Sequence, residues 1–141
     1  MATAHPYLHF NGNCETAFNF YRSVFGGEFE SVQRFKEGPA EHPFPDHELN
    51  KILHIALPLS SASMLMGSDI PEAFPQAVNG TNFYISLDME SEEEAGRVFN
   101  KLAEGGNIAM PIDKTFWGAY FGMVVDKFGV QWMVSFNYAR S

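Results

Sequence analysis

The strongest constraint in this sequence is a pattern that occurs twice. A short apolar strand, an amphipathic helix ending at a glycine pair, and three more strand-like segments appear in the N-terminal half and return in the C-terminal half. The helix-capping residues Asn13 and Ser91 are 78 positions apart, and the glycine pairs 26–27 and 105–106 are 79 apart. Such a repeat decides the fold, because each copy is one supersecondary unit with an apolar face to bury. We therefore expect an α+β domain made of two βαβββ units.

The first unit is predicted at about residues 4–69. Its helix should begin after Asn13, a favoured N-cap, and end at Gly26. The three prolines of Glu37–Asn50 exclude a central strand or a helix interior, so this segment is expected to be a surface loop. The expected strands, recognised by their apolar residues, are Pro6–Phe10, Phe29–Phe35, Ile52–Leu57 and Met64–Gly67.

The second unit is predicted at about residues 81–138, after a polar connector at about 70–80. Apolar and polar side chains alternate over residues 83–89, which is typical of a half-buried strand. This alternation puts Tyr84 opposite Phe83 and Ile85, and the latter two are expected to pack on the helix that begins after Ser91. The remaining strands are expected at Asn107–Met110, Phe116–Val125 and Val130–Phe136, with a tight turn at Asp126–Gly129.

Composition excludes several classes of function. The chain has 141 residues, enough for one domain, and its formal charge of −8 disfavours nucleic acid and anionic membranes as partners. Its single cysteine, Cys14, excludes an internal disulfide and a multi-thiolate metal site. The N-terminal stretch lacks the basic and apolar regions of a secretory signal, and no apolar run is typical of a membrane helix, so we expect a cytoplasmic protein.

Four motifs resemble the PhnB-like branch of the vicinal-oxygen-chelate superfamily, which includes glyoxalases, bleomycin-resistance proteins and dioxygenases. They are PYLHFNGNCETAFNFYRSVFGGE at 6–28, His54 with MLMGSD at 64–69, Trp117-Gly118, and DKFGVQW at 126–132. The resemblance implies that the two βαβββ modules stand in tandem and form open, curved mixed sheets around a crevice. It also implies a small-molecule ligand in that crevice.

Metal-using relatives hold a divalent ion with His, Glu or Gln, one ligand from each of four strands. The matching positions here are Pro6, Tyr84 and Met133, together with Ser63–Met66, which contains no carboxylate. A shift of one residue would admit His5, but one ligand does not make a site. We therefore expect no metal and no other cofactor. A metal-dependent lyase or dioxygenase with divergent ligands is the alternative.

Histidines are the candidate acid–base residues. His54 interrupts the apolar strand Ile52–Leu57, either as a hydrogen-bonded structural residue or as a catalytic residue facing the ligand. His9 lies 78 positions before Leu87, so it is expected on the helix-facing side of its strand. His42 and His47 belong to the proline-rich loop and are expected to be solvated, with adventitious metal binding as the alternative.

Five further residues are predicted to bind the ligand. Trp132 has the parity of Val134, so it should face the helix, which leaves Gln131 and Met133 facing the crevice with Tyr84. Trp117 would form an aromatic wall of the same pocket. The last of the five, Asp69, directly follows a strand; its carboxylate is either part of the site or a cap for neighbouring backbone.

Three functions remain open from the sequence. The first is a metal-free small-molecule binding protein or metal-independent enzyme, the second is the metal-dependent alternative, and the third is an assembly module without a ligand. One helix cannot cover both faces of a four-stranded sheet in a chain that is 45% apolar. The uncovered apolar surface predicts a homodimer.

Overall fold

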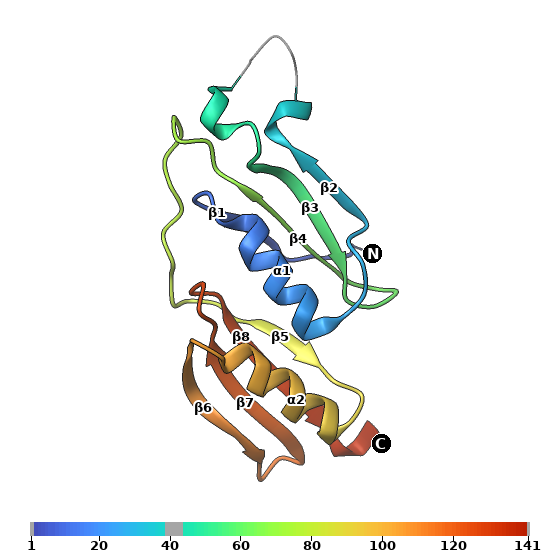
Figure 1. Cartoon of the computed structure of the whole chain (residues 1–141). Coiled ribbons are helices and arrows are strands. Elements are labelled where there is room, and N and C mark those ends of the chain that lie inside the picture. The colour runs from blue at the N-terminus through green and yellow to red at the C-terminus, as the bar shows by residue number, and fades with distance from the viewer. Residues whose placement is uncertain (1, 39–43, 141) are drawn as a thin grey trace. The chain divides into compact units, whose positions relative to one another are not determined.

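The computed structural model describes residues 2–38 and 44–140. The chain divides into two compact units, residues 1–78 and 79–141, and each is described by itself. Each unit consists of one four-stranded sheet and one long helix (Figure 1). His42, expected in the proline-rich loop, lies outside the described residues.

The sheet of the first unit has the strand order β1-β4-β3-β2. Strand β1 is parallel to β4, and the other neighbours are antiparallel, so the sheet is mixed. Short 3-10 helices at Phe35–Glu37 and Asp46–Glu48 flank the loop between β2 and β3. The bounds of the main elements are β1 Tyr7–Phe10, α1 Cys14–Phe25, β2 Ser31–Arg34, β3 Ile52–Pro58 and β4 Met64–Asp69.

The second unit repeats this arrangement in the order β5-β8-β7-β6, with β5 parallel to β8. The identical order confirms the predicted pair of βαβββ units. A 3-10 helix at Tyr138–Arg140 follows the last strand. The bounds are β5 Ile85–Asp88, α2 Glu92–Ala103, β6 Asn107–Lys114, β7 Ala119–Val125 and β8 Gln131–Asn137.

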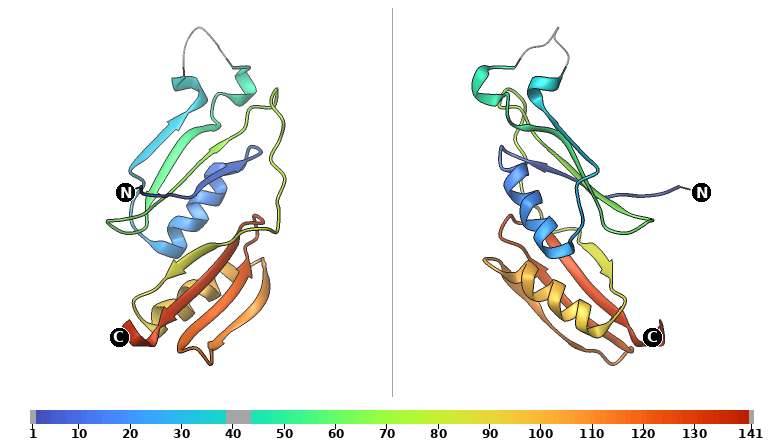
Figure 2. Two further views of the ribbon diagram at one scale, coloured as in Figure 1. Left: turned by 180° about the vertical axis from the view of Figure 1, so that it is seen from behind. Right: turned by 45° about the vertical axis from the view of Figure 1, so that its right-hand side comes forward.

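Each helix covers one face of its own sheet (Figure 2). A glycine in the sheet makes the approach possible in both units. A Cβ atom on Gly67 would lie 2.7 Å from the Phe18 ring of α1, and one on Gly122 would lie 2.7 Å from the Phe99 ring of α2. The two aromatic rings therefore pack directly on sheet backbone, and both are buried.

The helix ends agree with the sequence signals, with one difference. The Ser91 hydroxyl accepts from the backbone N–H of Glu94, 3.0 Å away, as the capping box predicts. Asn13 stands at the N-cap of α1, but its side chain makes no capping hydrogen bond. A carboxylate from another strand takes that role, as described below. Neither 12-residue helix, nor any other helix within 2–38 and 44–140, is long and apolar enough to cross a membrane.

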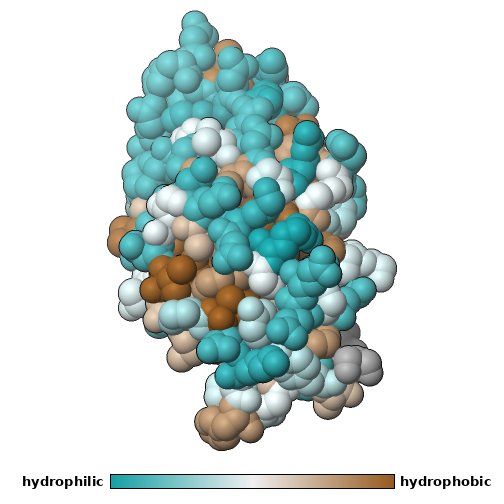
Figure 3. Space-filling model, turned by 60° about the horizontal axis from the view of Figure 1, so that its bottom comes forward, coloured by the Kyte–Doolittle hydropathy of each residue, from teal (hydrophilic) through white to brown (hydrophobic). Residues whose placement is uncertain are grey.

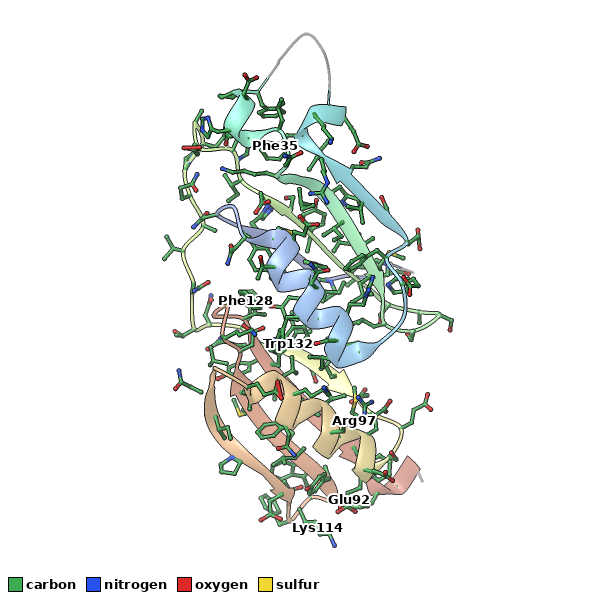
Figure 4. All side chains as sticks on the ribbon, viewed as in Figure 1. Phe35, Glu92, Arg97, Lys114, Phe128 and Trp132 are labelled. Carbon is green, nitrogen blue, oxygen red and sulfur yellow. The ribbon has the colours of Figure 1, made fainter. Side chains whose placement is uncertain are left out.

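Trp132 faces the helix side of the second sheet, as its parity predicts. It lies on β8 (Figure 4) and is fully buried. Its indole N–H donates to the Asp126 carboxylate in the preceding turn, 2.9 Å away. The same carboxylate accepts from the backbone N–H of Phe128 and Val130. Asp126 therefore builds the predicted tight turn and fixes the core indole at the same time.

Three expectations about strands are wrong. Leu8 is buried beneath α1, so His9 lies on the opposite face of β1 and not under the helix. Phe83 precedes β5 and is 66% exposed instead of packing on α2. Phe116 and Trp117 belong to the turn between β6 and β7, where Gly118 has a φ of +90°, and not to a strand.

Candidate functional site

The face of the first sheet opposite α1, here called the open face, carries a group of polar and aromatic side chains. Strand register defines it. Tyr7 of β1 pairs with Met66 of β4, which in turn pairs with Ala56 of β3. One row further, His9 pairs with Ser68 and Gln33 pairs with His54. Because side chains alternate along each strand, these residues share one face.

Tyr7 and His54 form the central contact of the open face. The Tyr7 hydroxyl oxygen lies 3.1 Å from Nδ1 of His54, and the two rings stack with centroids 5.7 Å apart. A phenol is a stronger acid than a neutral imidazole, so the hydroxyl donates to Nδ1 and the imidazole proton stays on Nε2. Tyr7 therefore fixes the orientation of the ring that the sequence predicts as catalytic.

His9 extends this contact to a second imidazole. Its Nδ1 lies 3.2 Å from the Ser68 hydroxyl, and its ring centroid lies 5.3 Å from that of Tyr7. Tyr7 thus contacts an imidazole on each side. We call Tyr7, His9, His54 and Ser68 the histidine–tyrosine cluster. Imidazoles exchange protons near neutral pH and hydroxyls donate hydrogen bonds, so this cluster can bind a polar ligand and move a proton.

The second unit has a corresponding open face. Met133 of β8 lies between Ser86 of β5 and Met123 of β7. Trp117, 57% exposed, contacts the ring of Phe121 on β7, with centroids 5.8 Å apart. This face is therefore mixed: Met123, Met133 and Phe121 share it with the polar side chains of Ser86, Asp88, Asp113 and Ser135. Of the predicted ligand-binding residues, Met133 lies on this face and Trp117 lies in the turn next to it.

Comparison with known proteins identifies the family. The model of the Glyoxalase/Bleomycin resistance protein/Dioxygenase superfamily matches residues 4–134. The chain belongs to this superfamily.

Among individual proteins, protein YjdN of Escherichia coli is 33% identical over 141 residues, and the match covers 92% of each chain. The crystal structure of protein PA1353 from Pseudomonas aeruginosa is 42% identical, with a TM-score of 0.85 over 97% of this chain and 98% of the other. A Bacillus cereus protein described as a putative 3-demethylubiquinone-9 3-methyltransferase, PhnB protein, is 28% identical, with a TM-score of 0.71 over 96% and 99%. The likeness to this protein supports the PhnB-like resemblance.

Gln131 and Tyr84, two other residues predicted to bind the ligand, lie where β8 meets the segment before β5. Gln131 is buried, and its side-chain amide donates to the backbone carbonyl of Phe83, 2.6 Å away. The amide therefore ties β8 to the segment before β5, which is a structural role. Tyr84 lies in that segment and is half-buried, and its part in ligand binding stays a prediction.

Asp69 has a structural role in the first unit. It is the last residue of β4, and its carboxylate is buried. One oxygen accepts from the backbone N–H of Gly12 and of Cys14, and the other accepts from that of Ile52, all at 2.9 Å. The capping interpretation of Asp69 thus fits the structure, and the carboxylate lies on the helix side of β4, away from the open face.

Cys14 does not have the surroundings of a nucleophile. It is fully buried at the first position of α1. Burial, and then the negative charges of Asp69 and Glu15, raise the pKa of its thiol far above the ordinary range. A helix N-terminus favours a thiolate in general, but desolvation dominates at this position.

A group of side chains that could bind a metal lies away from the open face. Within 2–38 and 44–140, His47, Glu48 and Glu72 form the only group of three whose ligand atoms lie within 4.8 Å of one another. The Lys51 ammonium lies 3.3 Å from the Glu48 carboxylate and 3.6 Å from that of Glu72. The Glu72 backbone N–H and Lys51 lower the pKa of the buried Glu48. The Lys51 ammonium thus already supplies these carboxylates with the positive charge that a metal ion would bring.

The sequence predicted His54 but missed the residues that hold it. Tyr7 and His9 escaped because the strand face was assigned through a repeat offset that is one residue too short for β1. The signal was present in the strand itself, since Leu8 and Phe10 are apolar and alternate with Tyr7 and His9. Ser68 had no signal of its own, because a serine in a strand is common in any role.

Proposed function

We propose that this superfamily member is a small-molecule binding protein or metal-independent enzyme whose ligand site includes the open face of the first sheet. The observation that carries the proposal is the contact of Tyr7 with His54 on one side and His9 on the other. A histidine with a purely structural role in a core is satisfied by its hydrogen-bond partner. Here two imidazoles and a phenol lie together on the face of the first sheet that α1 does not cover. His54 would be the acid–base residue and Tyr7 its positioning residue.

Met66 lies beside Tyr7 in the register of the open face and gives a direct probe for ligand binding. In protein labelled with 13C at the methionine methyl groups, members of a metabolite and fragment set should shift the Met66 signal. His54→Gln and Tyr7→Phe should weaken the binding of these compounds at least several-fold. His47→Gln is the matched control, because His47 lies outside the open face, and it should leave binding unchanged.

The same titrations test the metal-dependent alternative. A metal-independent site predicts equal binding before and after treatment with a chelator. Ligand shifts that disappear on chelation and return with a divalent ion would replace this proposal with the alternative. Compounds that bind without affecting Met66, and with equal strength in His54→Gln, would show that the site lies elsewhere.

We also propose a homodimer. Apolar side chains remain exposed in the second unit, and the surface that faces the viewer in Figure 3 shows brown patches among hydrophilic teal. Four of these side chains come from β6 and the turn that follows it: Ile108, Met110, Phe116 and Trp117. Phe116 is 97% exposed, which is unusual for a phenylalanine unless a partner covers it.

Sedimentation at micromolar concentration tests the dimer. We expect a mass near twice 15.8 kDa for the natural sequence and a shift toward 15.8 kDa for Phe116→Ser. Phe74→Ser, which removes an exposed aromatic side chain from the first unit, is the control and should sediment like the natural protein. A monomer that persists as the concentration rises would exclude the proposal.

A further inference from the structure

Charge is distributed unevenly between the open face and the rest of the chain. The chain has a formal charge of −8, yet the residues that the register places on the open face include no Asp or Glu. They include no Lys or Arg either. The register places two imidazoles there, those of His9 and His54. A third, His5, precedes β1, and its Nδ1 accepts from the backbone N–H of Met64, 3.1 Å away. In an acidic protein, this face thus has two sources of positive charge and no fixed negative charge.

Hydroxyl partners let both imidazoles be protonated without losing a hydrogen bond. Nδ1 of His54 faces the Tyr7 hydroxyl and Nδ1 of His9 faces that of Ser68. A hydroxyl donates to a neutral Nδ1 and accepts from a protonated one. When the hydroxyl donates to Nδ1, the ring proton is on Nε2, and in the charged ring both nitrogens carry a proton. Within the described part of the chain neither Nε2 has a hydrogen-bond partner. The cluster therefore presents donors from Nε2 whether the rings are neutral or charged.

We propose that the ligand of the open face is a small organic anion with a flat apolar body. Its oxygens would accept from Nε2–H of His54 and His9, and its body would lie against the Tyr7 ring and Met66. This inference rests on the proposed function and names the chemical class of its ligand. A carboxylate is the simplest anion of this kind, because it accepts hydrogen bonds and carries its charge throughout the range in which histidine titrates.

The proposal predicts how binding depends on pH. An ordinary imidazole becomes protonated below about pH 6.5, so the affinity for an anion should rise as the pH falls from 8.0 to 5.5. The neighbouring side chains on β1, β3 and β4 are Tyr7, Ala56, Met66 and Ser68, and on β2 Gln33 faces His54; none is an Asp, Glu, Lys or Arg. The other nearby imidazole is His5, bonded to the backbone of Met64, so His5→Gln is measured beside the variants of His9 and His54. A neutral analogue of the same shape should bind with no such dependence.

Benzoate and benzamide are a matched pair of probes, with acetate and acetamide as a smaller pair. Each is titrated into the full-length protein at pH 5.5 and 8.0 while the Met66 methyl signal is followed. We expect benzoate to bind about tenfold more tightly at pH 5.5 than at pH 8.0, because an anion is attracted by a positively charged imidazole and a neutral amide is not. Benzamide should bind equally at both values. His54→Gln and His9→Gln should each reduce the pH effect, and His47→Gln should preserve it.

Two results would overturn the inference. Equal binding of benzoate and benzamide at both pH values would show that the site does not select an anion, while the proposed function would stand. Carboxylates that never shift Met66, although uncharged members of the wider fragment set do, would lead to the same conclusion. The proposed function itself fails on different results: no compound of the wider set shifts Met66, or the shifts require a divalent ion.

Discussion

The carboxylate of Asp69 accepts a hydrogen bond from the backbone N–H of Cys14, 2.9 Å away, although 55 residues separate them in the chain. With the bonds from Gly12 and Ile52, this contact joins the end of β4 to the start of α1 and to the start of β3. The helix is therefore capped by tertiary structure and not by its own N-cap residue.

Asp69→Asn should destabilise the first unit by about 2–4 kcal/mol, because an amide has one accepting oxygen and cannot satisfy three N–H groups. The free energy of unfolding in urea measures the effect. Asp46→Asn is the control, since Asp46 is exposed and should change stability by less than about 0.5 kcal/mol. A loss for Asp69→Asn no larger than that of the control would contradict the capping role.

The Cys14 thiol should not react with iodoacetamide in the folded protein, because it is buried and its pKa is raised. In denaturant, mass spectrometry should show one modification per chain, as the sequence contains one cysteine. Asp69→Asn should increase the rate in native buffer, since it makes opening of the first unit easier. Fast modification of the natural protein in native buffer would show that α1 does not shield the thiol.

Gly67→Ala should destabilise the protein by about 1–3 kcal/mol. The new Cβ would lie 2.7 Å from the Phe18 ring and 2.9 Å from the backbone carbonyl of Leu8, and this carbonyl cannot move without breaking the pairing of β1 with β4. At Gly80 the nearest atom would be 3.6 Å away, so Gly80→Ala serves as the control. Thermal unfolding of the two variants should differ by several degrees.

Stability near pH 4 should depend on Glu15. Its carboxylate accepts two hydrogen bonds from the Arg34 guanidinium, at 2.9 and 2.7 Å, and these bonds lower the pKa of Glu15. A lowered carboxyl pKa adds stability above the ordinary value of about 4.3, and this stability is lost as the pH falls. Because the pair is partly exposed, we expect Glu15→Gln to lose at most about 1 kcal/mol at pH 7.

The loss in Glu15→Gln should shrink as the pH falls below the ordinary carboxyl value of about 4.3, and it should disappear once the pH is below the lowered pKa of Glu15, where the natural side chain is protonated as well. Urea unfolding at a series of pH values measures the difference. Glu30→Gln, which changes an exposed carboxylate next to β2, should show no such pH dependence. A constant difference between Glu15→Gln and the natural protein from pH 7 to pH 3 would exclude the ion pair as its cause.

The order and type of the elements could be predicted because their signals are local. Helix α1 lies between Asn13 and Gly26, and α2 begins directly after Ser91, where the capping residues and glycines predict these ends. The two sheets then have the same strand order, as the repeat predicts. Glycine and capping signals act within one turn of chain, so they are readable without knowledge of tertiary contacts.

The face of β1 could not be predicted from the helix caps. The caps are 78 residues apart, but Leu8 and Leu87, which are both buried, are 79 apart. A strand alternates at every residue, so this difference of one exchanged the two faces and put His9 beneath α1. The contact of Tyr7 with His54 joins residues 47 positions apart, and only the strand pairing reveals it.

The turn at Phe116 and Trp117 was predicted as strand because aromatic residues are common in strands. What decides the conformation is Gly118, whose φ of +90° reverses the chain, together with the Thr115 hydroxyl, which accepts from the N–H of Ala119.

The role of Asp69 could not be decided from the sequence either. A carboxylate at the end of a strand looks the same in sequence whether it binds a ligand or distant backbone groups.

The parallel pairing of β1 with β4 has a consequence for synthesis of the protein. Strand β1 leaves the ribosome well before its partner β4, which spans Met64–Asp69, so α1 has no complete sheet to cover until β4 emerges. During this interval Leu8, Phe10 and Phe18 are accessible to chaperones and to other nascent chains. The second unit repeats the delay between β5 and β8. Slow translation of residues 50–64 should therefore increase the fraction of chains that aggregate, whereas a chaperone that binds α1 should protect the nascent chain.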